Sequence, residues 1–309
     1  MLRTGGIVGA LALAVPATPA AAPPPFEILR WTAPGAELAA LSTQPAACLG
    51  SAAVEVQAGE ALFNSPRLLG GQAAKAGLSC AGCHVNGRDN AHFLMAGVSD
   101  RAGTADVTHS FFGAARGNGR FDPVTIPDLA RPGKVSRDPA GGALESFVRD
   151  LIVDEFAGRE PTPAMLAALA AYVRAIAPCP DGDPPGRRAL DDQLRLIDFA
   201  LRGATGMARR ADPVAARALL AAARHQLGLI AERYPAPPFG AERRELLAAS
   251  RVLADMHDKA ANSDGFIAAL SAWRAAFEKD LVQRLRRREA RSLYNPANLA
   301  FVAPQQDNR

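Results

Sequence analysis

The chain has 309 residues and a formal net charge of +4, and an ordinary 49% of its side chains are hydrophobic. This length is near that at which a single hydrophobic core splits, so we expect two domains. The apolar run near the N-terminus, residues 7–15, is too short to span a bilayer, and elsewhere no segment reaches the twenty uncharged residues that a transmembrane helix needs, so the sequence predicts none.

The N-terminus has the pattern of a secretory signal. Arg3 precedes an apolar run over residues 7–15, and small residues follow at 17–22. The prolines at positions 16, 19 and 23–25 argue against a buried helix here. We therefore predict a signal peptide over residues 1–22, cleaved after Ala20 or Ala22, and export, most simply to a bacterial periplasm.

The next segments lead up to one motif. Residues 23–50 are rich in Pro and Ala, which predicts an extended N-terminal arm, and residues 51–64 are expected to form a short helix. A Gly-rich region from 65 to 142 follows, with few helix or strand signals. We place one domain at residues 51–180.

That region contains the run Cys80-Ala81-Gly82-Cys83-His84. C-x-x-C-H is the attachment site of c-type haem: each thiol can add to one vinyl group, and the histidine can bind the iron as proximal ligand. A zinc site would need further Cys or His at matched spacing, and a redox dithiol would need a βαβ context. The sequence therefore predicts one covalent haem c, bound by Cys80 and Cys83 and ligated by His84.

Helices dominate the rest of the chain. Apolar residues recur at helical spacing over 143–157 and 162–177, and Thr162-Pro163 is a typical N-cap and first-turn pair. Breaker-rich sequence then predicts a linker at 181–188. Residues 189–309 are expected to form an antiparallel four-helix domain, which makes the fold class all-α. Its four helices are expected at 189–207, 213–234, 241–260 and 264–291.

Positive charge is concentrated in the second half. Residues 1–189 hold 16 basic and 17 acidic side chains, whereas residues 190–309 hold 19 and 14. Five arginines lie between positions 284 and 291, where we expect a solvated helix end that complements the helix dipole. In an exported protein this predicts no nucleic-acid partner; an acidic redox protein is the partner that the charge would fit.

Cys48 and Cys179 remain once the motif is set aside. An even number of cysteines in an oxidising compartment favours a disulfide over two buried thiols. The two residues bracket the 51–180 domain, and in cytochrome c architectures the first and last helices pack together. We therefore predict a Cys48–Cys179 bridge.

The region around the motif resembles the bacterial di-haem cytochrome c peroxidases and their single-haem relatives. The resemblance covers roughly residues 51–178, and the second half has no counterpart. It implies a cytochrome c-like haem domain with long irregular loops. It is carried by Gly59-Glu-Ala-Leu-Phe63, Ser65-Pro-Arg-Leu68, Leu78-Ser-Cys-Ala-Gly-Cys-His84, Ile126-Pro127-Asp128-Leu129 and Leu144-Glu-Ser-Phe-Val148.

This chain departs from that family because it has one haem motif where those peroxidases have two. Without a second haem to store an electron, the balance shifts from enzyme to electron carrier. For the distal side of the iron we place Met95 first, because a thioether suits a carrier, and His92 and His109 next. The other ring nitrogen of His84 is expected to contact a backbone carbonyl at Pro123 or Pro127.

Four arginines, at positions 88, 116, 120 and 131, are candidates to pair with haem propionates. Taken together, these patterns predict an exported mono-haem c-type cytochrome that carries single electrons in a periplasmic pathway. Two alternatives stay open. One is a peroxidase-like or ligand-sensing haem protein with an open distal side, and the other is a haem subunit that docks on a larger oxidoreductase.

Overall fold

The computed structural model describes residues 26, 30–113, 115, 117–180, 182, 184–261 and 263–302. The predicted signal peptide, residues 1–22, lies outside the described residues. The described chain is mostly helical, as predicted, and its strands are four segments of two residues each. In these same ranges, no helix combines the length and the apolar character needed to cross a membrane.

Two helices frame the first half of the chain, α2 (Val54–Phe63) and α7 (Pro163–Ala175), and they pack against each other. The predicted cap of α7 is confirmed, because the Thr162 side chain accepts a hydrogen bond from the Met165 amide at 3.3 Å. The other elements of this half are short: α1 (Glu37–Ser42), β1 (Thr43–Gln44), α3 (Pro66–Leu69), α4 (Gly71–Lys75), α5 (Cys80–Cys83), a 3₁₀ turn (Val85–Gly87), β2 (Thr104–Ala105), β3 (Val124–Thr125), α6 (Ala143–Asp150) and a π turn (Leu151–Glu155).

The second half consists of longer helices. Asp212 caps α9 (Pro213–Arg233), because its carboxylate accepts a hydrogen bond from the Ala215 amide at 2.9 Å. The helix expected at 264–291 has the expected extent but is not uniform, because a π turn interrupts it at Phe277–Val282. The elements are β4 (Gly186–Arg187), α8 (Leu190–Arg209), α9 (Pro213–Arg233), α10 (Gly240–Asp255), a 3₁₀ turn (Asp258–Ala261), α11 (Ser263–Ala276), α12 (Gln283–Arg288), a second 3₁₀ turn (Glu289–Arg291) and α13 (Pro296–Ala300).

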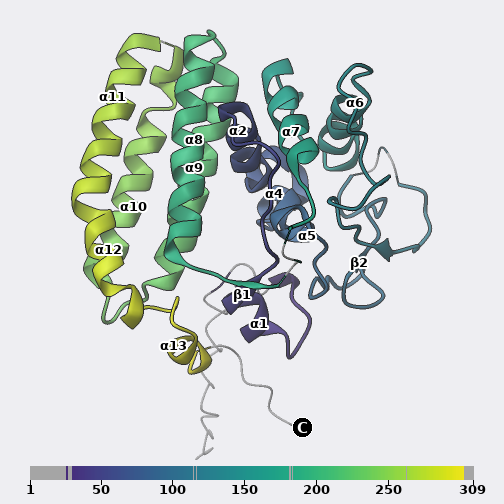
Figure 1. Cartoon of the computed structure of the whole chain (residues 1–309), viewed down its shortest axis with the longest axis horizontal. Coiled ribbons are helices and arrows are strands. Elements are labelled where there is room, and N and C mark those ends of the chain that lie inside the picture. Colours follow the sequence, from purple (N-terminus) through teal and green to yellow (C-terminus); the bar gives the residue numbers. More distant parts are fainter. Residues whose placement is uncertain are drawn as a thin grey trace, which may run out of the picture.

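The two halves meet at α2, which lies between α7 and α8 (Figure 1). A Cβ atom at Gly203 of α8 would lie only 2.9 Å from the Ala58 Cβ, so α2 and α8 approach closely. One continuous cluster of buried side chains runs from Val56 in α2 to Tyr294, which follows the 3₁₀ turn at Glu289–Arg291. The apolar faces of both halves therefore share one core.

Three segments differ from the sequence-based expectation. The segment at 23–50 is not extended throughout, because it contains the helix α1. β4 lies inside the predicted linker and pairs antiparallel with β1, with Thr43 opposite Arg187. Helix α13 was not predicted; its Leu299 packs with Phe26, Leu41 and Leu293 in a small separate core.

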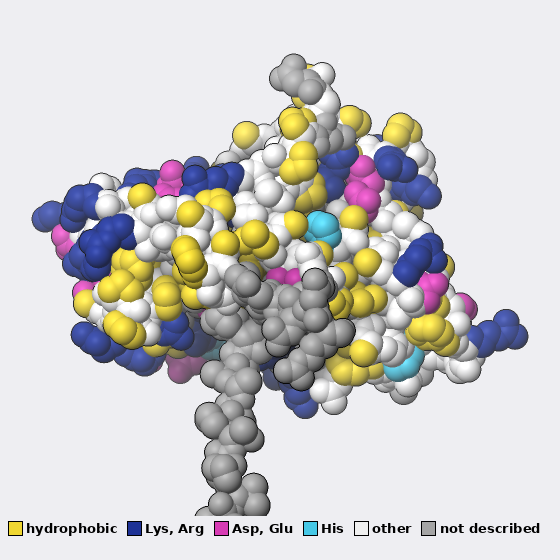
Figure 2. Space-filling model, turned by 90° about the horizontal axis from the view of Figure 1, so that it is seen from below, with side chains coloured by type: hydrophobic (Ala, Val, Ile, Leu, Met, Phe, Trp, Pro, Cys, Tyr) yellow, Lys and Arg dark blue, Asp and Glu magenta, His cyan; other side chains and the backbone are white. Residues whose placement is uncertain are grey.

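Three of the five arginines at positions 284–291 are paired with carboxylates rather than simply solvated. An Arg286 Nη2 atom lies 2.8 Å from an Asp191 oxygen of α8, and Arg284 and Arg288 pair with glutamates of α10. Figure 2 shows basic side chains around the left part of the lower face, on the side of α10 to α12. Because neighbouring helices supply the counter-charges, this end presents less net positive charge than its sequence suggests.

Candidate functional site

The two cysteines of the motif lie on the single turn of α5. Ser79 is extended and Cys80 begins the turn, and the His84 amide closes it by donating to the Cys80 carbonyl at 2.8 Å. A Cβ atom at Gly82 would lie 2.7 Å from Leu78 Cδ1, so the small residue lets the turn pack on Leu78. Residues three apart on a helix share a face, so the two thiols project from the same side.

His84 is fixed by one contact. Its Nδ1 atom lies 3.1 Å from the Pro127 carbonyl oxygen, which confirms that the Pro127 segment supplies the expected backbone partner. Although the ring is only half-buried, the surrounding protein atoms lower its pKa to about 4, and the Pro127 carbonyl opposes part of this shift. The imidazole is therefore neutral near pH 7, so that Nδ1–H can donate to Pro127 and the Nε2 lone pair can bind a metal.

Both motif cysteines are free thiols in the structure. Burial raises the pKa of each to about 12, with the neighbouring Cys80 adding to the shift at Cys83. Reactive redox cysteines have the opposite property, a lowered pKa. Within the described ranges, no three His, Cys, Asp or Glu side chains converge to hold a metal ion.

The donor set at this turn fits a covalent haem. It consists of two protonated thiols on one face and a neutral imidazole that follows them directly, with its Nδ1 atom oriented by Pro127. These groups match the two thioether bonds and the single proximal nitrogen that haem c requires.

The three distal candidates occupy different surroundings. Met95 is 5% exposed and belongs to the core that also contains Leu78. His92 and His109 are half-buried in loops, and His109 Nδ1 already accepts a hydrogen bond from the Phe111 amide at 3.1 Å. The candidates for the distal side of the iron are thus one buried thioether and two half-buried imidazoles.

Arg88, one of the arginines considered for haem propionates, already has a carboxylate partner. Its Nε and Nη2 atoms each lie 2.8 Å from one oxygen of Asp128. The side chain of Arg131 is largely exposed and lies 3.8 Å from the same carboxylate. Arg120 is exposed, and Arg116 lies outside the described residues.

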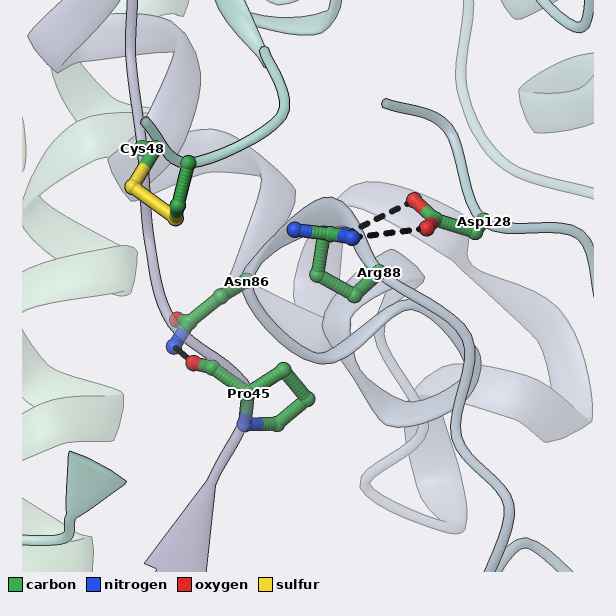
Figure 3. Close-up of a disulfide and its surroundings, with 6 residues drawn as sticks. Pro45, Cys48, Asn86, Arg88 and Asp128 are labelled. Atoms are coloured by element: carbon green, nitrogen blue, oxygen red, sulfur yellow. Dashed lines mark hydrogen bonds and ion pairs between the residues drawn. A yellow bond between two sulfur atoms is a disulfide. The ribbon is translucent and has the colours of Figure 1, made fainter. Parts of the chain in front are cut away.

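The predicted disulfide is present, joining Cys48 to Cys179 with Cα atoms 5.3 Å apart. The backbone around Cys48 runs alongside the segment that leaves the end of α7, because the Ala177 amide donates a hydrogen bond to the Cys48 carbonyl at 2.9 Å. Nearby, Asn86 adopts a left-handed conformation and donates from its side chain to the Pro45 carbonyl at 2.8 Å (Figure 3). The disulfide segment therefore braces the residues that follow His84.

Sequence reasoning missed a buried polar group on α2, at the contact with α8. Glu60 of α2 is 2% exposed, and burial raises its pKa although Arg195 of α8 donates to it at 2.7 Å. Tyr172 of α7 packs on Phe63 with ring centroids 5.1 Å apart, and burial raises its pKa as well. The only signal in the sequence was a glutamate within the apolar stretch of α2.

A cavity of about 630 Å³ lies on the side of α5 formed by the residues between the two cysteines. Its walls include Ala81 and Gly82 of the motif turn, Arg195 of α8 and His225 of α9. Burial lowers the pKa of His225 to about 4. The turn that carries the thiols therefore faces the second half of the chain across this cavity.

No protein-family model, curated protein or solved structure matches this chain.

Proposed function

We propose that this protein is an exported mono-haem c-type cytochrome that carries single electrons in a periplasmic pathway. The observation that carries the proposal is the α5 turn, which places two thiols and a neutral, oriented imidazole on five consecutive residues. In this proposal a cytochrome c-like all-α haem domain is followed by an antiparallel four-helix domain.

The chain's own groups take defined roles. The Cys80 and Cys83 thiols would each add S–H across one vinyl double bond, which forms a thioether without oxidation or reduction. His84 Nε2 would bind the iron while Nδ1–H donates to Pro127. Haem c, when bound, supplies an iron that accepts and releases one electron.

A closed distal side would suit electron transfer, and Met95 is the candidate of this chain for closing it. A thioether from a side chain that is 5% exposed would exclude water and other ligands from the iron. With one haem and no second electron store, rapid peroxide turnover would depend on an outside donor.

Optical spectra of the purified holoprotein, ferric and ferrous, with and without carbon monoxide, test this proposal. A carrier should be low-spin and bind carbon monoxide poorly. Met95→Leu should open the site, whereas Met165→Leu, at an equally buried core methionine, should leave the spectrum unchanged. A high-spin wild-type protein that binds carbon monoxide readily would support the peroxidase-like or ligand-sensing alternative instead.

A further inference from the structure

A buried ion pair, Arg88–Asp128, lies close in sequence to both partners of the contact between His84 Nδ1 and the Pro127 carbonyl. Arg88 follows His84 by four residues, and Asp128 follows Pro127 by one. The guanidinium meets the carboxylate as a two-pronged fork at 2.8 Å for each bond, with side chains 8% and 6% exposed (Figure 3). The pair therefore connects the segment that carries the imidazole to the segment that carries its carbonyl partner.

Further bonds fix the same two segments. The Leu129 amide donates to the Gly87 carbonyl at 3.0 Å, and the Asp128 carboxylate also accepts from the Ala130 amide at 2.8 Å. A Cβ atom at Gly87 would lie 2.3 Å from Ile176 Cδ1, so this backbone is held from its other side by the end of α7. The Pro127 carbonyl thus lies in a segment with little freedom to move relative to His84.

A buried ion pair is weak evidence for stability, because removing two charges from water costs about as much as their attraction returns. Such a pair is better explained by what it orients. The partner of a ligating imidazole fixes the ring and raises its basicity, and loss of that partner weakens the ligand.

We propose that Arg88 and Asp128 are positioning residues that hold the Pro127 carbonyl on His84 Nδ1 and thereby set the reduction potential of the haem iron. This inference rests on the proposed function, because it requires haem at His84.

The positioning role predicts the direction in which the reduction potential shifts when the ion pair is broken. A looser Nδ1–H···O=C contact makes the imidazole a poorer donor, which disfavours ferric iron more than ferrous iron, so the potential rises. A role through charge alone predicts a different pattern. Loss of the negative charge in Asp128→Asn would raise the potential, loss of the positive charge in Arg88→Gln would lower it, and Arg88→Lys would leave it unchanged.

The experiment is a redox titration of the full-length mature holoprotein and these three variants, with Glu145→Gln as the matched control. Glu145 forms a similar two-pronged pair with Arg174, which links α6 to α7. Exchange of the His84 Nδ1 proton with solvent, followed by NMR, gives a second readout that charge alone would not change.

The positioning role requires all three variants at the pair to raise the potential and to speed Nδ1 proton exchange, with the control at the wild-type values. Opposite shifts for Asp128→Asn and Arg88→Gln, or an unchanged Arg88→Lys, would overturn it. If Asp128→Asn gives no holoprotein, Arg88→Lys decides, since it retains the charge and removes the fork. A wild-type protein without covalent haem would instead refute the proposed function, before any variant is compared.

Discussion

The closest backbone approach involving α2 offers a direct test of the packing. A Cβ atom at Gly59 would lie 1.9 Å from the Ala168 carbonyl oxygen and 2.6 Å from its carbonyl carbon. Both atoms belong to the backbone of α7, so no side-chain rotation can relieve the overlap. In Gly59→Ala, α2 and α7 must therefore move apart.

The expected cost follows from two opposing effects. Replacing Gly by Ala inside a helix stabilises it by about 1 kcal/mol. Overpacking costs about 1–3 kcal/mol or more, and a gap of ~1 Å loses up to about half of the dispersion energy of the contacts it opens. Because the overlap is with rigid backbone, we expect a cost of about 3 kcal/mol and a net loss of about 2 kcal/mol in the free energy of unfolding.

Urea denaturation followed by circular dichroism measures this loss. The matched control is Gly228→Ala in α9, where a Cβ atom would meet no other atom within 4 Å. That variant should be more stable than wild type by about 0.5–1 kcal/mol. If Gly59→Ala were as stable as Gly228→Ala, the close packing of α2 on α7 would be wrong.

Two other predictions concern the disulfide and an ion pair. Replacing Cys48 and Cys179 together by Ser should lower the free energy of unfolding by up to about 5 kcal/mol, since the bridge closes a loop with a sequence separation of 131; unchanged denaturation curves would argue against the bridge. Glu145→Gln should cost about 1 kcal/mol at pH 7. The hydrogen bond from Arg174 lowers the pKa of Glu145, so this stabilisation is complete above the ordinary value of 4.5 and is lost as the pH falls through the lowered pKa. Wild-type and variant stabilities should converge in acid, and a constant difference down to low pH would contradict the assignment.

Local signals in the sequence predicted local structure well. Thr162 and Asp212 precede a proline and a run of helical periodicity, and both cap the helix that follows. The Cys48–Cys179 pair could be predicted because only two cysteines were left once the motif was set aside. The need of a ligating imidazole for a backbone acceptor predicted a carbonyl at Pro123 or Pro127, and His84 contacts the one at Pro127.

Features that depend on distant partners could not be predicted. Glu60 binds Arg195, which is 135 residues away, and no local pattern pairs them. Asp128 belongs to the Ile126-Pro127-Asp128-Leu129 run, but no local pattern pairs its carboxylate with Arg88. The run of arginines in α12 looked like a solvated helix end because the carboxylates that neutralise it come from α8 and α10.

The most direct test of the central claim is the intact mass of the denatured mature protein, produced in a host that attaches haem to exported proteins. We expect the mass of the polypeptide plus one haem. The added haem mass should be absent from a Cys80→Ser/Cys83→Ser variant and present in a Cys48→Ser/Cys179→Ser variant. A wild-type mass equal to that of the polypeptide alone, or haem that acidic organic solvent extracts, would contradict the claim.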